Sequence, residues 1–457
     1  MTFAIRGVIE GYYGPPRSWA ARERSVDFMA GRGLNAYLYA PKNEPLHRSR
    51  WREPYLPEEQ HRFAAFDTRC RDGGIDFVFG LSPLGFRYDA DDDLACLLAK
   101  VDAAAAVGIR HFCLLTDDMS GGQAGERVTS RFDDLGQAHA WLVNSVHRHL
   151  RGRGNGRSLW FVPVQYCGSP ATPYLGTIGE LVAPQVPICW TGPQVCSPML
   201  DLDHTRAVAA VLRRPVLYWD NHPVNDGDMR FDPHLGPLTG RDPRLPEAAC
   251  GLLANLALEA EASHVAVATV ADYCAEPSGY DPRRSWGRAL ADVAGDPADA
   301  EAVAVLAELS WRSPLGKRQG GDSRLTGVLT RVQDTAGGDD ADRRAAVADA
   351  RTEVTRLAEA AERLAGLANP WLRDDLRPWV TKLAGWAATL TPATDLLARA
   401  LDDPNAIDDS QPSPLTDVRH AATERLAEAR TSSYWVSDDL LDQLARACLW
   451  QAEALGA

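Results

Sequence analysis

The sequence predicts an α/β fold, a (β/α)8 TIM-type barrel followed by an all-α helical bundle. Three observations predict it. Eight short apolar runs lie between residue 3 and about residue 275, amphipathic stretches separate most of them, and strand patterns disappear after about residue 300. Near-continuous apolar strands that alternate with helices are typical of a parallel sheet whose faces are covered by helices.

The eight apolar runs are short and rich in β-branched and aromatic residues, which favours strands over helices. We expect the strands at Phe3–Glu10, Ala36–Ala40, Phe77–Leu81, His111–Leu115, Leu159–Val164, Pro187–Trp190, Val216–Trp219 and Gly251–Ala254.

Amphipathic stretches fill most of the gaps between these runs. Residues 221–251 show no clear helical pattern, but elsewhere we expect helices at Ser18–Met29, Glu58–Arg71, Leu94–Val107, Leu135–Leu150 and Thr205–Arg213. A doubly wound open sheet is the alternative architecture for such an alternation. It is disfavoured because no GxGxxG motif follows the first strand.

The chain changes character after about residue 300, where it becomes rich in Ala, Leu, Arg and Glu. Apolar residues there lie at three- and four-residue spacings and share one helix face: Val354, Leu357, Ala361, Leu364 and Leu367. Pro370 ends this helix, and further helices are expected at Trp371–Leu401, Leu415–Ala429 and Ser437–Leu455. The sequence thus predicts a barrel at residues 1–280, a connecting segment at 281–310 and a helical bundle at 311–457.

The composition is that of an ordinary soluble protein, with 45% hydrophobic and 24% charged residues, and the formal net charge is −14. An acidic chain without basic runs disfavours nucleic acid and anionic membrane surfaces as partners. The nine cysteines are scattered and form no CxxC pair, so neither a disulfide framework nor a zinc site is expected. Signal-peptide and membrane-spanning patterns are not evident, so a cytoplasmic location is expected.

Barrel enzymes carry their sites at the carboxyl ends of the strands, where the loops begin. The polar and aromatic residues at these points are candidates for one shared mouth. Carboxylates and amides suit hydroxyl groups, and aromatic rings suit the faces of sugars, so the set indicates a sugar site. Its members are Glu10, Gly11, Tyr12, Tyr13, Lys42, Asn43, Ser82, Asp117, Asp118, Gln165, Tyr166, Trp190, Thr191, Asp220, Asn221, Asn225, Asp226 and Asn255.

The adjacent carboxylates Asp117 and Asp118 follow the apolar run HFCLLT and are the centre of this set. Two neighbouring carboxylates repel each other and titrate as a coupled pair, so one is expected to hold a proton near neutral pH. Acid–base cleavage of a glycosidic bond requires such a proton. Neighbours on one strand need not face the bond from opposite sides, but this requirement disappears when the substrate's own acetamide is the nucleophile.

The residues by themselves leave other interpretations open. Asp117 and Asp118 could bind magnesium, although no supporting Glu or His ligand is evident beside them. They could also be an ordinary loop pair, and the other site candidates could have packing or surface roles. A sugar-binding or scaffolding protein, with the helical half as its working part, is a further alternative.

At these residues the sequence resembles glycoside hydrolase family 84, the family of protein O-GlcNAcases and bacterial β-N-acetylglucosaminidases. The matching segments run in order through the barrel: RGVIEGYYG at 6–14, NAYLYAPKNEPLHRSRWREPY at 35–55, LLTDDM at 114–119, QYCG at 165–168, WTGP at 190–193, YWDNHPVND at 218–226 and GLLAN at 251–255. An ordered series is more specific than any single motif. The helical half resembles the stalk of that family only in composition and position.

The resemblance implies a retaining exo-β-N-acetylglucosaminidase that hydrolyses terminal β-linked GlcNAc by substrate-assisted catalysis through an oxazoline intermediate. Asp117 would orient and polarise the acetamido group, and Asp118 would be the general acid and then the base. Substrate-binding residues would be Gly11, Tyr13, Lys42, Tyr166, Trp219, Asn221, Asp226 and Asn255. No metal or organic cofactor is implied. The partners implied are a GlcNAc-terminated glycan or glycoprotein and, because stalks of relatives can pair, a second copy of the chain through the helical domain.

Two positions depart from the family's pattern. Gly227 stands where animal members carry a tyrosine, and Leu256 stands where a proline follows the asparagine. The first is expected to change contacts with the group beyond the sugar, and neither touches the acid–base pair. The acidic motifs of families 18 and 20 do not fit LLTDDM.

Overall fold

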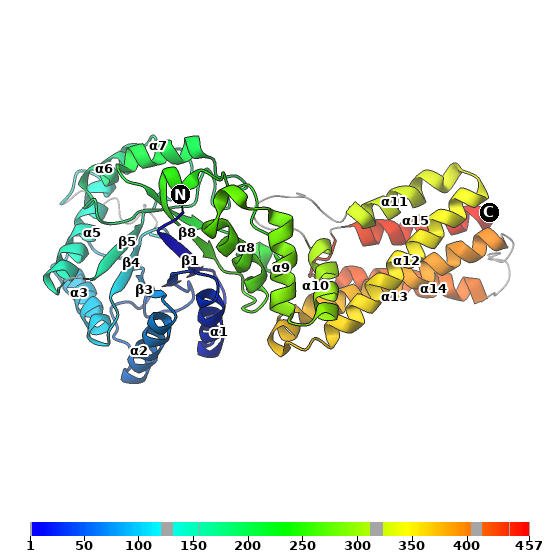
Figure 1. Cartoon of the computed structure of the whole chain (residues 1–457), viewed down its shortest axis with the longest axis horizontal. Coiled ribbons are helices and arrows are strands. Elements are labelled where there is room, and N and C mark those ends of the chain that lie inside the picture. Colours follow the sequence, from blue (N-terminus) through cyan, green and yellow to red (C-terminus); the bar gives the residue numbers. More distant parts are fainter. Residues whose placement is uncertain are drawn as a thin grey trace. The chain divides into compact units, whose positions relative to one another are not determined.

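The computed structural model describes residues 2–119, 131–154, 156–310, 323–403, 414–437 and 439–456. The chain divides into two compact units (Figure 1): Met1–Asp228 with Pro237–Trp286, and Met229–Gly236 with Gly287–Ala457. The first unit contains all eight strands found among the described residues, and the described part of the second consists of helices and their connections.

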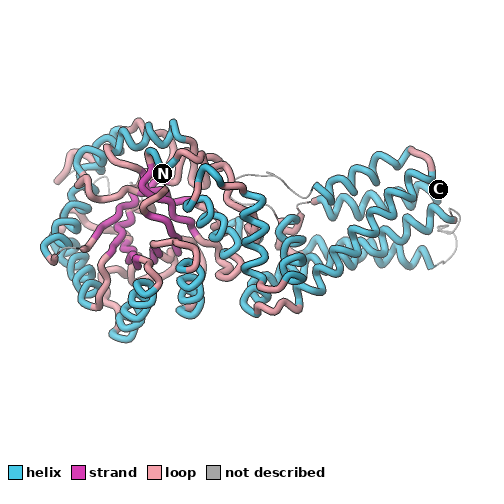
Figure 2. Tube along the Cα trace, in the orientation of Figure 1, coloured by secondary structure: helices cyan, strands magenta, loops and turns pink. Residues whose placement is uncertain are grey.

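Eight parallel strands form the barrel of the first unit, in the order β5-β4-β3-β2-β1-β8-β7-β6. An isolated parallel bridge between Phe161 and Ile188 links the two ends of this sheet. The predicted barrel is therefore confirmed, with the strands inside a ring of helices (Figure 2). The strands are β1 (Ile5–Glu10), β2 (Ala36–Tyr39), β3 (Asp76–Leu81), β4 (His111–Leu115), β5 (Ser158–Val162), β6 (Cys189–Trp190), β7 (Val216–Asp220) and β8 (Ala249–Asn255).

Helices follow most of the strands, and polar side chains cap several of them. Ser18 accepts a hydrogen bond from the backbone of α1, and Asp134 does the same for α5. Only short 3-10 turns, at Gly227–Phe231 and Leu245–Glu247, lie between β7 and β8. The helices are α1 (Trp19–Ala30), α2 (Pro57–Asp72), α3 (Asp91–Ala106), α5 (Leu135–Gly152), α6 (Pro173–Leu181), α7 (Leu202–Leu212) and α8 (Ser263–Ala275).

Side chains alternate between the barrel interior and the surrounding helices along each strand. Leu38 of β2 belongs to the interior cluster. Its neighbours Tyr37 and Tyr39 instead pack edge-on against Phe66 and Phe63 of α2. A polar residue at a strand end can therefore face either the mouth of the barrel or the helices, and its position in the sequence does not decide which.

The second unit confirms the predicted helical bundle. Pro370 is the first residue of α13, which Asn369 caps and which continues through Pro378 and Pro392. The proposed connecting segment, residues 281–310, carries two helices of this series. No described helix combines the length and the apolar character needed to cross a membrane. The helices are α9 (Pro282–Ala294), α10 (Pro297–Leu309), α11 (Ser323–Asp334), α12 (Asp340–Ala365), α13 (Pro370–Asp402), α14 (Pro414–Thr431) and α15 (Leu440–Gly456).

Candidate active site

Two carboxylates and one lysine form a compact cluster at the carboxyl ends of the strands. Asp117 and Asp118 follow β4, and Lys42 follows β2. The Lys42 ammonium nitrogen lies 2.5 Å from Asp117 Oδ2 and 2.8 Å from Asp118 Oδ2. The Lys42 and Asp117 side chains are 5% and 10% exposed, and that of Asp118 is 26% exposed. The structure thus brings the acidic pair and the lysine together in a largely buried place.

The charges in this cluster decide its protonation. Burial alone would raise the pKa of Asp118, but Lys42, a hydrogen bond from Tyr13 and the charge of Arg48 outweigh it and hold the pKa below its usual value. Burial alone would lower the pKa of Lys42, but the two carboxylates raise it above its usual value. In this arrangement Asp118 is therefore not the member of the pair that holds the predicted proton near neutral pH. The physical reason is that Lys42 offsets the repulsion between the two carboxylates.

The second oxygen of Asp117 has no donor in the part of the protein that the structure describes. Asp117 Oδ1 is buried without a hydrogen-bond partner among the described residues. A buried acceptor without a donor is costly, so this oxygen suits an N–H or O–H group of a bound molecule. Tyr166, which follows β5, is a second polar group here. Burial, followed by the charge of Asp117, raises the pKa of Tyr166 to about 12, so its hydroxyl keeps its proton at neutral pH.

A chain of hydrogen bonds fixes the ends of β1, β7 and β8. The Gly11 backbone amide donates to Asn255 Oδ1 at 3.1 Å, and the side-chain Nδ2 of Asn255 donates to Asn221 Oδ1 at 2.9 Å. The Trp219 indole donates to the same Asn221 oxygen at 2.9 Å. A Cβ atom on Gly11 would lie 2.4 Å from the Trp219 ring, so the close packing of this ring requires glycine. These four residues form a rigid and well-connected part of the site.

Asp226 and Tyr13 meet between the loops after β7 and β1. The Tyr13 amide donates to Asp226 Oδ2 at 2.6 Å. Burial raises the pKa of Asp226, and the charge of Asp118 adds to this effect. Tyr13 is 45% exposed, and its ring centroid lies 6.0 Å from the Lys42 nitrogen. Tyr13 therefore lies at the exposed edge of the cluster, and Asp226 lies within reach of its charges.

Some polar residues at strand ends do not join this cluster. Glu10 is fully buried and forms an ion pair with Arg22 of α1, while the Tyr37 hydroxyl also donates to it. The prediction that it lies at the mouth is wrong, because the last residue of β1 faces the helices. Asp220 is similarly buried and accepts two hydrogen bonds from the Arg241 guanidinium. Both carboxylates are taken up by structural ion pairs.

The structure adds Arg48 to the cluster, and the sequence analysis did not single it out. Its guanidinium lies 2.7 Å from Asp118 Oδ2, and its side chain is 15% exposed. The sequence did contain a feature that could have pointed to Arg48 as a site residue, because Arg48 stands six positions after Lys42 inside the matching segment at 35–55. Spacing alone did not show that its side chain turns back toward the carboxylates.

The two departures from the family's pattern have different consequences. Gly227 has a φ of +59°, and no atom lies within 4 Å of an added Cβ, so a side chain there would meet backbone strain but no clash. Leu256 is buried, and its amide donates to the Ile9 carbonyl at 3.0 Å. A proline at this position could not make that hydrogen bond.

Metal ligands are not grouped in the part of the chain that the structure describes. No set of three or more His, Cys, Asp and Glu residues there has the arrangement needed to hold a metal ion. The Lys42 ammonium lies where a cation shared by Asp117 and Asp118 would bind. The donor set therefore favours an internal lysine as the partner of the acidic pair.

The chain is similar to known proteins in sequence and in fold. A family described as beta-N-acetylglucosaminidase matches residues 6–308. The protein O-GlcNAcases of Rattus norvegicus and Mus musculus are each 33% identical over 278 residues, which cover 58% of this chain and 29% of theirs. The chain thus spans about three tenths of the length of these curated relatives.

Solved structures extend the likeness to the helical unit. A mutant of the O-GlcNAc hydrolase of Thermobaculum terrenum is 27% identical with a TM-score of 0.89, and the match covers 99% of this chain and 96% of that one. A chain called CpGH84B is 24% identical with a TM-score of 0.84, over 98% of this chain and 77% of that one, and this likeness shows the fold alone.

Proposed function

Because the chain belongs to the β-N-acetylglucosaminidase family, glycoside hydrolase family 84, we propose that it hydrolyses terminal β-linked GlcNAc with retention of configuration. One observation carries this proposal: Asp117 and Asp118 share the ammonium group of Lys42. Two carboxylates that contact one cation from the same strand end are poorly placed to attack a sugar carbon from opposite faces. A nucleophile within the substrate, its 2-acetamido group, resolves this difficulty.

In the first step the acetamide oxygen attacks the anomeric carbon. The glycosidic bond breaks, its electron pair stays on the leaving oxygen, and Asp118 gives that oxygen a proton. Asp117 Oδ1, which has no partner among the described residues, accepts the acetamide N–H and stabilises the positive charge that develops on the oxazoline ring. The Tyr166 hydroxyl, which keeps its proton at neutral pH, donates to the same group.

In the second step water attacks the anomeric carbon, and the bond from this carbon to the oxazoline oxygen breaks, its electron pair staying on that oxygen to restore the acetamide. Asp118 accepts the proton from the water. Asp118 therefore alternates between its ionised and protonated forms, and the proposal requires the incoming sugar to weaken the hold of Lys42 on it. The sugar would be bound by the residues that surround the pair: Gly11, Tyr13, Lys42, Trp219, Asn221, Asp226 and Asn255.

The experiment that tests this function is release of an aryl group from an N-acetyl-β-glucosaminide, with and without a chelator. The proposal expects turnover that the chelator does not change. Turnover that a chelator abolishes would favour a metal-dependent hydrolase instead. Binding of GlcNAc without turnover would favour the sugar-binding or scaffolding alternative. The natural substrate proposed is a GlcNAc-terminated glycan or glycoprotein.

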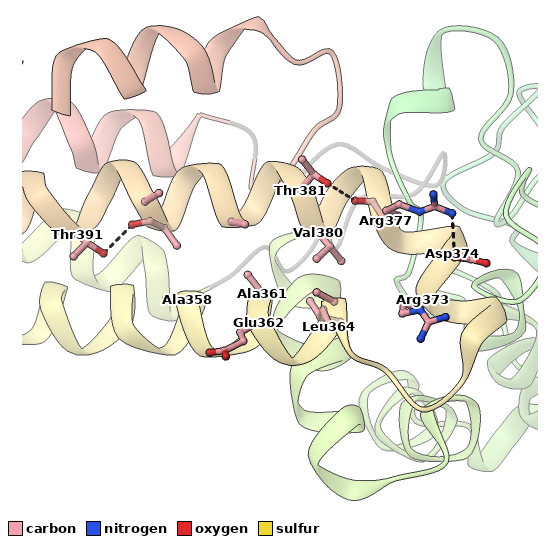
Figure 3. Close-up of a pocket in the computed structure, with 14 residues that line it drawn as sticks. Ala358, Ala361, Glu362, Leu364, Arg373, Asp374, Arg377, Val380, Thr381 and Thr391 are labelled. Atoms are coloured by element: carbon pink, nitrogen blue, oxygen red, sulfur yellow. Dashed lines mark hydrogen bonds and ion pairs between the residues drawn. The ribbon is translucent and has the colours of Figure 1, made fainter. Parts of the chain in front are cut away.

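A second proposal concerns self-association of the helical unit. A cavity of about 680 Å³ lies between α12 and α13, and it is lined by small and apolar residues that include Ala361, Leu364 and Val380 (Figure 3). Charged residues, among them Glu362 and Arg377, border it. We propose that this cavity between α12 and α13 receives a second copy of the chain. Light scattering at micromolar concentration should give the mass of a dimer, and the mass of a monomer would contradict the proposal.

A further inference from the structure

Arg48 contacts the acid–base carboxylate, and the mechanism above gives it no part. We propose that Arg48 is a positioning residue whose guanidinium joins the loops after β1, β2 and β4 and holds the Asp118 carboxyl group where it meets the glycosidic oxygen. This inference rests on the proposed function, because it gives Arg48 a part in the same reaction. It assigns Arg48 no contact with the sugar.

The contacts of Arg48 reach three separate loops. Nη1 donates to the Lys42 carbonyl at 3.1 Å, which fixes the loop after β2. Nη2 donates to Asp118 Oδ2 at 2.7 Å after β4, and to the Tyr13 hydroxyl at 3.3 Å after β1. A planar guanidinium presents its donors in a fixed fork, so these contacts constrain one another. Loss of the fork would remove one hydrogen bond from Asp118 and one from the Tyr13 hydroxyl together, and would leave Lys42 to hold Asp118.

The backbone that carries Arg48 is itself held in place. The Glu44 carboxylate accepts hydrogen bonds from the amides of Leu46 and His47. Burial lowers the pKa of His47 to about 3, so its ring is neutral, and its Nε2 donates to the Pro41 carbonyl at 2.8 Å. The Arg48 guanidinium also lies over the Tyr13 ring, 5.4 Å from its centroid. Arg48 is therefore an ordered side chain on a fixed turn, unlike most exposed arginines.

The charge of Arg48 should also influence when Asp118 carries a proton. Among the described residues, the groups that face Asp118 are the cations Lys42 and Arg48, the carboxylates Asp117 and Asp226, and the phenols Tyr13 and Tyr166. Without Arg48, one of the two cations that the described residues set against the carboxylates would be lost, so the pKa of Asp118 should rise. Because the first step needs protonated Asp118 in the complex with the sugar, the fall in kcat on the alkaline side should then move to higher pH.

The test compares kcat from pH 4 to pH 9 for the wild type, Arg48→Gln and Arg48→Lys, because kcat reports the protonation of the complex with the sugar. Two aryl N-acetyl-β-glucosaminides are used, one with a good leaving group and one with a poor leaving group. For Arg48→Gln we expect a loss of about 10-fold on the poor leaving group and a much smaller loss on the good one, because only the former needs the positioned acid. The alkaline limb should move up by about one pH unit. Arg48→Lys keeps the charge, so its alkaline limb should stay in place.

Arg52→Gln is the matched control. Arg52 lies on the same loop but pairs with Asp93, which keeps a second partner in Arg87. This variant should retain the wild-type pH profile and leaving-group dependence. Equal losses of Arg48→Gln on both substrates, or a profile that superposes on the wild type, would overturn the inference while the proposed function stands. If Arg48→Gln does not fold, a shifted limb in Arg48→Lys would overturn it. A wild type without turnover would overturn both.

Discussion

Replacement of Asp118 with asparagine is expected to lower kcat/KM at least about 100-fold on a substrate with a poor leaving group, because the leaving oxygen then receives no proton. The loss should shrink as the leaving group improves. Replacement of Asp117 with asparagine should lower the rate by a similar factor on every substrate, because the carboxylate that stabilises the oxazoline charge is lost. Steady-state kinetics with a series of aryl N-acetyl-β-glucosaminides measure both effects.

The matched control for these variants is Asp102→Asn. Asp102 lies on α3 and pairs with His149 and Arg153 at a partly exposed position. A pair of this kind contributes about 0–1 kcal/mol to stability, and we expect no change in rate. Leaving-group dependence that is the same for Asp117→Asn and Asp118→Asn would contradict the separate roles assigned to the two carboxylates.

Replacement of Arg22 with methionine is expected to reduce the free energy of unfolding by about 3–5 kcal/mol, because it leaves a buried carboxylate without its cation. Arg22 Nε and Nη2 lie 2.8 and 2.9 Å from the two oxygens of Glu10, and the side chains of this pair are 4% and 0% exposed. The Arg17 amide and the Tyr37 hydroxyl, which also donate to Glu10, cannot replace the lost charge. Urea unfolding followed by circular dichroism measures the loss.

Arg24→Met, two positions further along α1, is the control for this prediction. Arg24 pairs with Glu261, and their side chains are 27% and 13% exposed, so water screens the pair. The expected loss is about 0–1 kcal/mol. If Arg22→Met and Arg24→Met lower the free energy of unfolding equally, burial does not determine how much the Glu10 ion pair contributes to stability.

The sequence predicted the barrel well because its strands are buried on both faces and separated by clear turns. It missed α6 for a physical reason. This helix has only nine residues, PYLGTIGEL, and two of them are glycines that weaken a helical pattern. Gly179 is required because a Cβ atom there would lie 2.1 Å from the Val211 carbonyl at the end of α7. The packing that explains α6 thus lies in contacts between segments far apart in the sequence.

The positions of the candidate site residues could be predicted from strand ends, but their directions and charges could not. The rule that barrel sites lie at the carboxyl ends of the strands placed Lys42, Asp117 and Asp118 at one mouth, and the structure brings them together. The same rule placed Glu10 there, although it faces the helices. Repulsion within the acidic pair suggested a shared proton, but this argument omitted the cation that lies between the two carboxylates. The position of Glu10 depends on side-chain direction and the protonation of the pair depends on a neighbouring charge, and spacing along the chain encodes neither.

The central claim is that the acetamide of the substrate is the nucleophile. The most direct test compares the release of one aryl group from the N-acetyl-β-glucosaminide and from the matching β-glucoside, which has a hydroxyl group in place of the acetamide. The account predicts turnover of the first and none detectable of the second, at concentrations where the glucoside occupies the site. Comparable turnover of both substrates would contradict it, because a group on the protein would then have to supply the nucleophile.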